Sequence, residues 1–114
     1  MFPASRVVVA ESLAASDRQK PVVAAYKQAY EARYKEDVST FGGHAYDALG
    51  ILVRAVKEAG LDRAKVRAAI ENMKGFVGTA GVFNFSPEDH NGLALDAFEM
   101  LTVKGGKFVV LGDR

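Results

Sequence analysis

The sequence predicts an α/β fold with one strand near the start, three helices in the middle and an antiparallel hairpin at the end. A β-branched run opens the chain, apolar residues then recur at helical spacing, and apolar-polar alternation follows. The chain has 114 residues, which suits one domain. With 49 % hydrophobic and 25 % charged residues, its composition is that of an ordinary globular protein.

Charge and composition argue against several classes of partner. The 15 basic and 14 acidic side chains give a net charge of +1, and no basic stripe stands out, so nucleic acid is disfavoured. The apolar runs are far shorter than a membrane span requires. There is no cysteine, so no disulfide and no thiolate ligand can form. The first residues lack the pattern of a signal peptide, and any such segment is expected outside this chain.

The run Arg6–Ala10 contains three consecutive valines and predicts a strand. It is apolar on both faces, which is typical of a buried strand in a parallel sheet. Such a strand needs a neighbour on each side, and no second run of this kind follows before the C-terminal part. The pattern therefore indicates that part of the sheet is missing from the chain.

A first helix is predicted from Ser16 to about Tyr34. Ser16 is its expected N-cap, with Gln19 as the partner in a capping box. Pro21 falls in the first turn, where proline is tolerated. The tyrosines of this helix fit a core-and-rim face better than a binding stripe, because they recur at helical spacing. The apolar face consists of Val22, Tyr26 and Tyr30.

A second helix is predicted over His44–Ala59, ended by Gly60. Because its own apolar side chains occupy almost the whole circumference of the helix, we expect it to be buried on nearly all sides. One face carries Tyr46, Leu49, Val53 and Val56, and much of the rest carries Ala45, Ala48, Ile51, Leu52 and Ala55.

The remaining elements follow from caps and turns. Asp62 is the expected N-cap of a third helix that Gly75 ends. A short strand is predicted over 82–85, and a dense turn cluster follows it. The last elements are a strand from Leu95 to Val103, a tight turn at residues 104–107 and a strand from Lys107 to Leu111.

The stretch Ser39–Asp47 is the candidate functional segment. It combines an aromatic, two glycines, a histidine, a tyrosine and an acid where a loop becomes a helix. Glycines allow close approach to another surface, and a helix start attracts an anionic group. The alternative is that Gly42 and Gly43 form only a flexible entry and that His44 and Tyr46 are ordinary first-turn residues.

Catalytic and metal sites are weakly supported. Thr40, His44 and Asp47 could in principle form a nucleophile, base and acid, but no nucleophile elbow surrounds any serine. Glu88 to His90 lie in a turn without further ligands at a supporting spacing. No phosphate-binding glycine loop occurs. We therefore predict no enzyme activity, no cofactor and no metal.

The order of motifs resembles the C-terminal portion of a type I periplasmic solute-binding protein of the branched-chain amino acid (leucine/isoleucine/valine) ABC-transporter family. The resemblance covers nearly all of the chain. Its motifs are Val7–Ala10 with Glu11-Ser12-Leu13, Val22–Tyr30, Gly43–Ala48, Ala59-Gly60 and Gly78–Ser86 before the last hairpin.

The resemblance implies a fragment of a two-lobed fold that closes on a small ligand. Residues 1–114 would form a single partial domain. Residues 1–16 would hold a strand of one lobe, 17–94 the helical segment of the other lobe, and 95–114 the C-terminal hairpin. The chain would cross between lobes near 16–20 and near 93–96.

The resemblance also implies a function. Phe41 matches a residue that packs against the ligand, and His44, Tyr46 and Asp47 would lie at or just behind it. The solute would be an amino acid or an aromatic carboxylate, delivered by the full-length parent protein to the membrane permease of an ABC transporter. The family is periplasmic.

The chain departs from the family in length, because most of both parallel sheets is missing. Two outcomes are physically reasonable. The chain is a fragment of a longer solute-binding protein, or it exchanges elements with a second copy, since orphan apolar faces and strand edges drive pairing. In the second case it is a homo-oligomeric association module that binds no solute.

Overall fold

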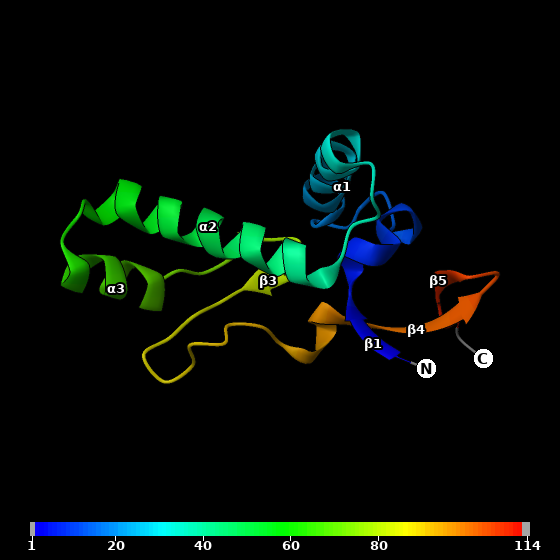
Figure 1. Cartoon of the computed structure of the whole chain (residues 1–114). Helices are drawn as coiled ribbons and strands as arrows, with labels where there is room; N and C mark the ends of the chain where they lie inside the picture. Colours follow the sequence, from blue (N-terminus) through cyan, green and yellow to red (C-terminus); the bar gives the residue numbers. More distant parts are fainter. Residues whose placement is uncertain (1, 113–114) are drawn as a thin grey trace.

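A computed structural model describes residues 2–112 and shows a mixed α/β architecture, which confirms the predicted class (Figure 1). In chain order the elements are β1 (Phe2–Ser5), η1 (Arg6–Ser12), α1 (Lys20–Tyr34), α2 (Thr40–Ala59), α3 (Arg63–Glu71), β2 (Phe76–Val77), β3 (Val82–Phe83), η2 (Leu95–Ala97), β4 (Phe98–Lys104) and β5 (Lys107–Val110). Both η elements are 3-10 helices. Among residues 2–112, no helix combines the length and the hydrophobicity that a membrane-spanning segment requires.

The strands form two small antiparallel sheets. The larger has the order β1-β4-β5, and the smaller pairs β2 with β3. Gly105 and Gly106 have φ of 55° and 75°, the positive values that a tight two-residue hairpin turn needs. The C-terminal hairpin is therefore where the sequence predicts it. Its first strand begins at Phe98 instead of Leu95, because residues 95–97 form η2.

The predicted strand over Arg6–Ala10 is wrong, since this segment lies in η1. The strand is β1, four residues earlier, where Ser5 lies opposite Phe98 of β4. Strand pairing is available there, whereas the valine run has no neighbouring parallel strand among residues 2–112. Val7 is instead fully buried in a cluster that includes residues of α1. Tertiary contact has overridden β-propensity.

The start of α1 also differs from the prediction. The helix begins at Lys20, and its N-cap position is Gln19 without a side-chain cap. Ser16 is therefore not the N-cap. Asp17 makes the preceding turn, because its Oδ1 accepts a hydrogen bond from the backbone N–H of Gln19 at 2.8 Å. Pro21 lies in the first turn, as predicted.

Helix α2 begins at Thr40, four residues before the predicted start. The Ser39 hydroxyl accepts a hydrogen bond from the backbone N–H of Gly42 at 3.3 Å, which caps the helix. The glycine pair is therefore helical and not part of a loop. The helix ends at Gly60, whose φ is 74°, as predicted.

The prediction that α2 is buried on nearly all sides is wrong. Its buried line is Gly43, Asp47, Ile51 and Ala55. The face with Leu49 and Val53 is exposed, and Leu49 has 62 % of its surface accessible. Within residues 2–112 no other element covers this face.

Apolar residues gather into two separate cores. Core 1 lies between the C-terminal part of α2, α3 and the β2–β3 region, and Core 2 lies between η1 and α1. The buried members of Core 1 are Ile51, Ala55, Ala69, Met73, Ala80, Phe83 and Phe85. Those of Core 2 are Val7, Ala10, Leu13, Val23, Tyr26 and Val38. The described part is elongated, with a radius of gyration of 15.4 Å, against about 13 Å for a compact domain of this length.

Candidate functional site

The predicted site residues lie in the first two turns of α2, but they do not point the same way. Phe41 is 86 % exposed, His44 is exposed, and Tyr46 is 55 % exposed. Asp47 is 2 % exposed and faces the interior. Phe41 and His44 are three residues apart, so they are neighbours on the helix surface.

The carboxylate of Asp47 is fully engaged by the loop between β2 and β3. Its Oδ1 accepts a hydrogen bond from the backbone N–H of Thr79 at 2.7 Å. Its Oδ2 accepts one from the N–H of Ala80 at 2.8 Å and one from the Thr79 hydroxyl at 3.2 Å. Asp47 therefore anchors this loop to α2, and we expect it to support the exposed residues instead of contacting a solute.

Tyr46 belongs to a row of tyrosines shared between α1 and α2. Its ring centroid lies 5.0 Å from that of Tyr26, which lies 5.8 Å from Tyr30, and Tyr30 lies 4.8 Å from Tyr34. Burial raises the pKa of Tyr26 above its ordinary value. Within the row, only the contact between Tyr26 and Tyr46 joins the two helices, and the other rings lie along α1.

A pocket of about 410 Å³ opens beside Phe41. Its apolar wall includes Phe41 itself, Val103 of β4 and Phe108 of β5, and the hydroxyl-bearing Ser39 and Thr40 complete the side formed by α2. The positive end of the α2 dipole lies at this side. The pocket can therefore hold an apolar body and place an anionic group near the helix start. The two residues from the hairpin lie far away in sequence, and no local motif indicates them.

The larger hollow, of about 760 Å³, lies elsewhere, between α2 and α3. Leu52, Val56, Leu61, Val66 and Ile70 contribute to it. It is mostly apolar, open to solvent, and contains none of the predicted site residues. Its polar lining residues are Arg63, Arg67, Glu71 and His90. Glu71 already pairs with both Arg67 and His90, so these groups are less free to orient a small ligand.

Neither a catalytic triad nor a metal cluster is found among residues 2–112. Both carboxylate oxygens of Asp47 accept hydrogen bonds from the β2–β3 loop, so Asp47 does not orient His44. No group of three or more potential metal ligands occurs in the described range. His90 lies 3.1 Å from a carboxylate oxygen of Glu71 on α3, so it links the 86–92 turn to that helix.

Comparison with known proteins places this geometry in a family. The family model described as periplasmic binding protein matches residues 3–107. No curated protein sequence matches the chain at a significant level.

Several solved structures share the fold. Rp1789 of Rhodopseudomonas palustris CGA009 is 29 % identical with a TM-score of 0.88, and an extracellular ligand-binding receptor from R. palustris HaA2 is 30 % identical with a TM-score of 0.82. In both cases the match covers 96 % of this chain and 33 % of the relative. The leucine binding protein LivK of Thermotoga maritima is 28 % identical with a TM-score of 0.68, over 87 % of this chain and 27 % of that protein. This chain thus spans about a third of the length of the solved proteins that it matches.

The family model covers most of the chain, and the structural matches retain the arrangement of its helices and hairpin. The resemblance found in the sequence is thereby confirmed, and the chain belongs to the periplasmic binding protein family.

Proposed function

We propose that this chain supplies part of the binding site of a solute-binding protein that holds an amino acid or an aromatic carboxylate without changing it chemically. The observation that carries the proposal is the pocket beside the exposed ring of Phe41. Apolar walls suit the body of such a solute, and the positive end of α2 suits its carboxylate. His44 lies one turn along the same helix, where it can contact a solute held against Phe41.

The family supports the rest of the proposal. Family members are generally binders without enzyme activity, and the relatives include extracellular ligand-binding receptors and a leucine binding protein. We infer a periplasmic location and delivery of the solute to an ABC-transporter permease by a full-length protein. The remaining two thirds of such a protein would close the pocket from the other side.

The test is a thermal-shift and calorimetric screen with leucine, phenylalanine and benzoate. One arm uses the 114-residue chain, and a second uses a chimera in which this chain replaces the matched third of Rp1789. LivK with leucine is the positive control. A ligand at one hundred times its Kd should stabilise the protein by about 2.7 kcal/mol. If none of the three ligands stabilised either protein while leucine stabilised LivK, the proposal would be contradicted.

Replacing Phe41 with alanine is expected to weaken binding about tenfold, because one aromatic contact is lost. The melting temperature without ligand should hardly change, since the Phe41 side chain is exposed. Leu95→Ala is the matched control, because Leu95 is 90 % exposed and does not line the pocket. Calorimetry on the chimera measures both variants. Equal affinity for Phe41→Ala and the unmodified chimera would remove Phe41 from the site.

The alternative function is that of an association module in which two copies pair and bind no solute. The exposed face of α2 favours it, since contiguous apolar surface commonly marks an interaction site. This face is formed by Leu49, Leu52 and Val53. The elongated shape points the same way.

Light scattering at micromolar concentration tests this alternative. A dimer should have twice the chain mass of 12.3 kDa. Leu49→Lys should convert it to a monomer, because a charge would then be buried in the interface. Leu95→Lys places the same charge on another exposed leucine and should leave the dimer intact. A folded monomer in the unmodified protein eliminates the association module.

A further inference from the structure

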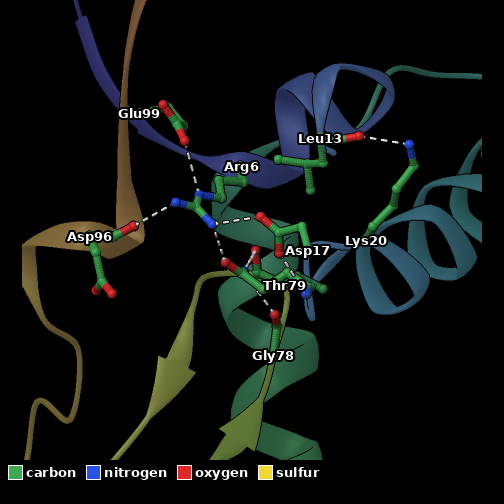
Figure 2. Close-up of polar contacts among 9 residues, drawn as sticks. Arg6, Leu13, Asp17, Lys20, Gly78, Thr79, Asp96 and Glu99 are labelled. Carbon is green, nitrogen blue, oxygen red and sulfur yellow. Dashed lines mark hydrogen bonds and ion pairs between the residues drawn. The ribbon is translucent and has the colours of Figure 1, made fainter. Parts of the chain in front are cut away.

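The two cores are joined by a cluster of polar side chains. Arg6 lies at its centre, at the point where β1 passes into η1 (Figure 2). Its Nη1 donates to Asp17 Oδ2 at 2.9 Å and reaches Gln19 Oε1 at 3.4 Å. Its Nη2 donates to the backbone carbonyl of Asp96 at 3.0 Å. One guanidinium thus holds the segment before α1 and the segment before β4.

The same guanidinium is paired with the larger sheet. Arg6 Nε lies 3.1 Å from Glu99 Oε1 on β4, an ion pair whose angle falls outside hydrogen-bond geometry. Two carboxylates, those of Asp17 and Glu99, therefore face one cation. The side chain of Arg6 is only 22 % exposed, so these contacts are partly shielded from solvent and salt.

Gln19 extends the cluster toward α2. Gln19 is 3 % exposed. Its Nε2 donates to the backbone carbonyls of Gly78 and Thr79 at 3.1 and 3.3 Å. Thr79 in turn donates to Asp47 through both its N–H and its hydroxyl. An uninterrupted series of polar contacts therefore runs from Glu99 on the sheet, through Arg6 and Gln19, to Asp47 on α2.

We infer that Arg6, Asp17, Gln19 and Glu99 form a polar joint that sets the orientation of α2 relative to the sheet β1-β4-β5. The pocket beside Phe41 takes its walls from both α2 and this sheet, so the joint positions one wall against the other. An arginine suits this role because its planar fork can bond several segments in fixed directions at once. The inference concerns the free protein and does not depend on the identity of any solute.

Distance measurements between spin labels test the joint directly. The chain has no cysteine, so Lys57→Cys on α2 and Lys104→Cys at the end of β4 give two unique exposed labels. Arg6→Gln should make the distance distribution about twice as broad as in the unmodified protein, because the joint then loses its directional bonds. Arg67→Gln is the matched control, since the Arg67 side chain is 73 % exposed and pairs with Glu71 on the same helix, α3.

Two further variants separate the joint from general loss of stability. Arg6→Lys keeps the charge but not the fork, and it should broaden the distribution nearly as much as Arg6→Gln. Glu99→Gln removes the charge of one partner of Arg6 and should broaden the distance distribution less. Far-UV circular dichroism establishes that each variant is folded. If Arg6→Gln does not fold, Glu99→Gln and Arg6→Lys decide the result, and distributions as narrow as that of the unmodified protein overturn the inference.

Discussion

Replacing Asp47 with alanine is expected to lower the free energy of unfolding by about 3 to 5 kcal/mol. The variant leaves the backbone N–H groups of Thr79 and Ala80 without their acceptor. Both residues are almost completely buried, so water cannot easily replace the carboxylate. The loss should also release the β2–β3 loop from α2, because Asp47 contributes three hydrogen bonds between them.

Urea unfolding followed by circular dichroism measures this effect. Asp47→Asn keeps one carbonyl acceptor but turns an amide toward a backbone donor, so its loss should be smaller than that of alanine and still clear. Asp62→Ala is the control, because Asp62 caps α3 through one exposed hydrogen bond to the N–H of Lys65. That substitution should cost about 1 kcal/mol. Equal losses for Asp47→Ala and Asp62→Ala would show that the buried contacts matter little.

The second large effect is expected at Gly43. Alanine in place of glycine within a helix normally gains up to about 1 kcal/mol. Here we expect a loss of about 2 kcal/mol, because an added Cβ would lie only 2.6 Å from the hydroxyl oxygen of the buried Thr79. The absence of a side chain at Gly43 thus allows α2 to pack closely against the β2–β3 loop. Either the helix or the Thr79 side chain would have to shift.

Gly112→Ala is the matched control for Gly43→Ala, since nothing lies within 4 Å of a Cβ at that position. The double variant Gly43→Ala with Thr79→Ala removes the hydroxyl that would collide with the new methyl group. The double variant should therefore lose less stability than the sum of the losses of the two single variants. Thermal unfolding of the unmodified chain, the two single variants and the double variant measures this difference. If Gly43→Ala were as stable as the unmodified chain, the close approach would have no energetic consequence.

Some local signals in the sequence predict local structure well, whereas others fail: Ser16 does not cap α1, and α3 ends at Glu71, before Gly75. Gly60 ends α2 and Asp62 caps α3 as expected, because each signal depends only on the few residues around it. The two glycines of the last hairpin are equally reliable for the same reason. The valine run of η1 fails, because a strand exists only when another strand pairs with it, and periodicity does not show whether that partner is present.

The candidate site divides in the same way. The sequence places Phe41 just before a predicted helix, close to its observed place in the first turn of α2. Val103 and Phe108 reach the same pocket only through the tertiary fold. The spacing of residues in the sequence does indicate that Asp47 points inward. Asp47 shares four-residue spacing with Gly43, Ile51 and Ala55, which together form the buried line of α2.

The loop that Asp47 anchors has one more consequence. Successive backbone N–H groups at residues 79 and 80 each donate to one oxygen of the same carboxylate, and paired N–H groups of this kind can bind small anions. Here the anion is the side chain of Asp47, so the site is occupied whatever the concentration of free anions in the solution. Because the charge is shielded from mobile ions, the seating of α2 on this loop should be indifferent to the ionic composition of the surrounding compartment.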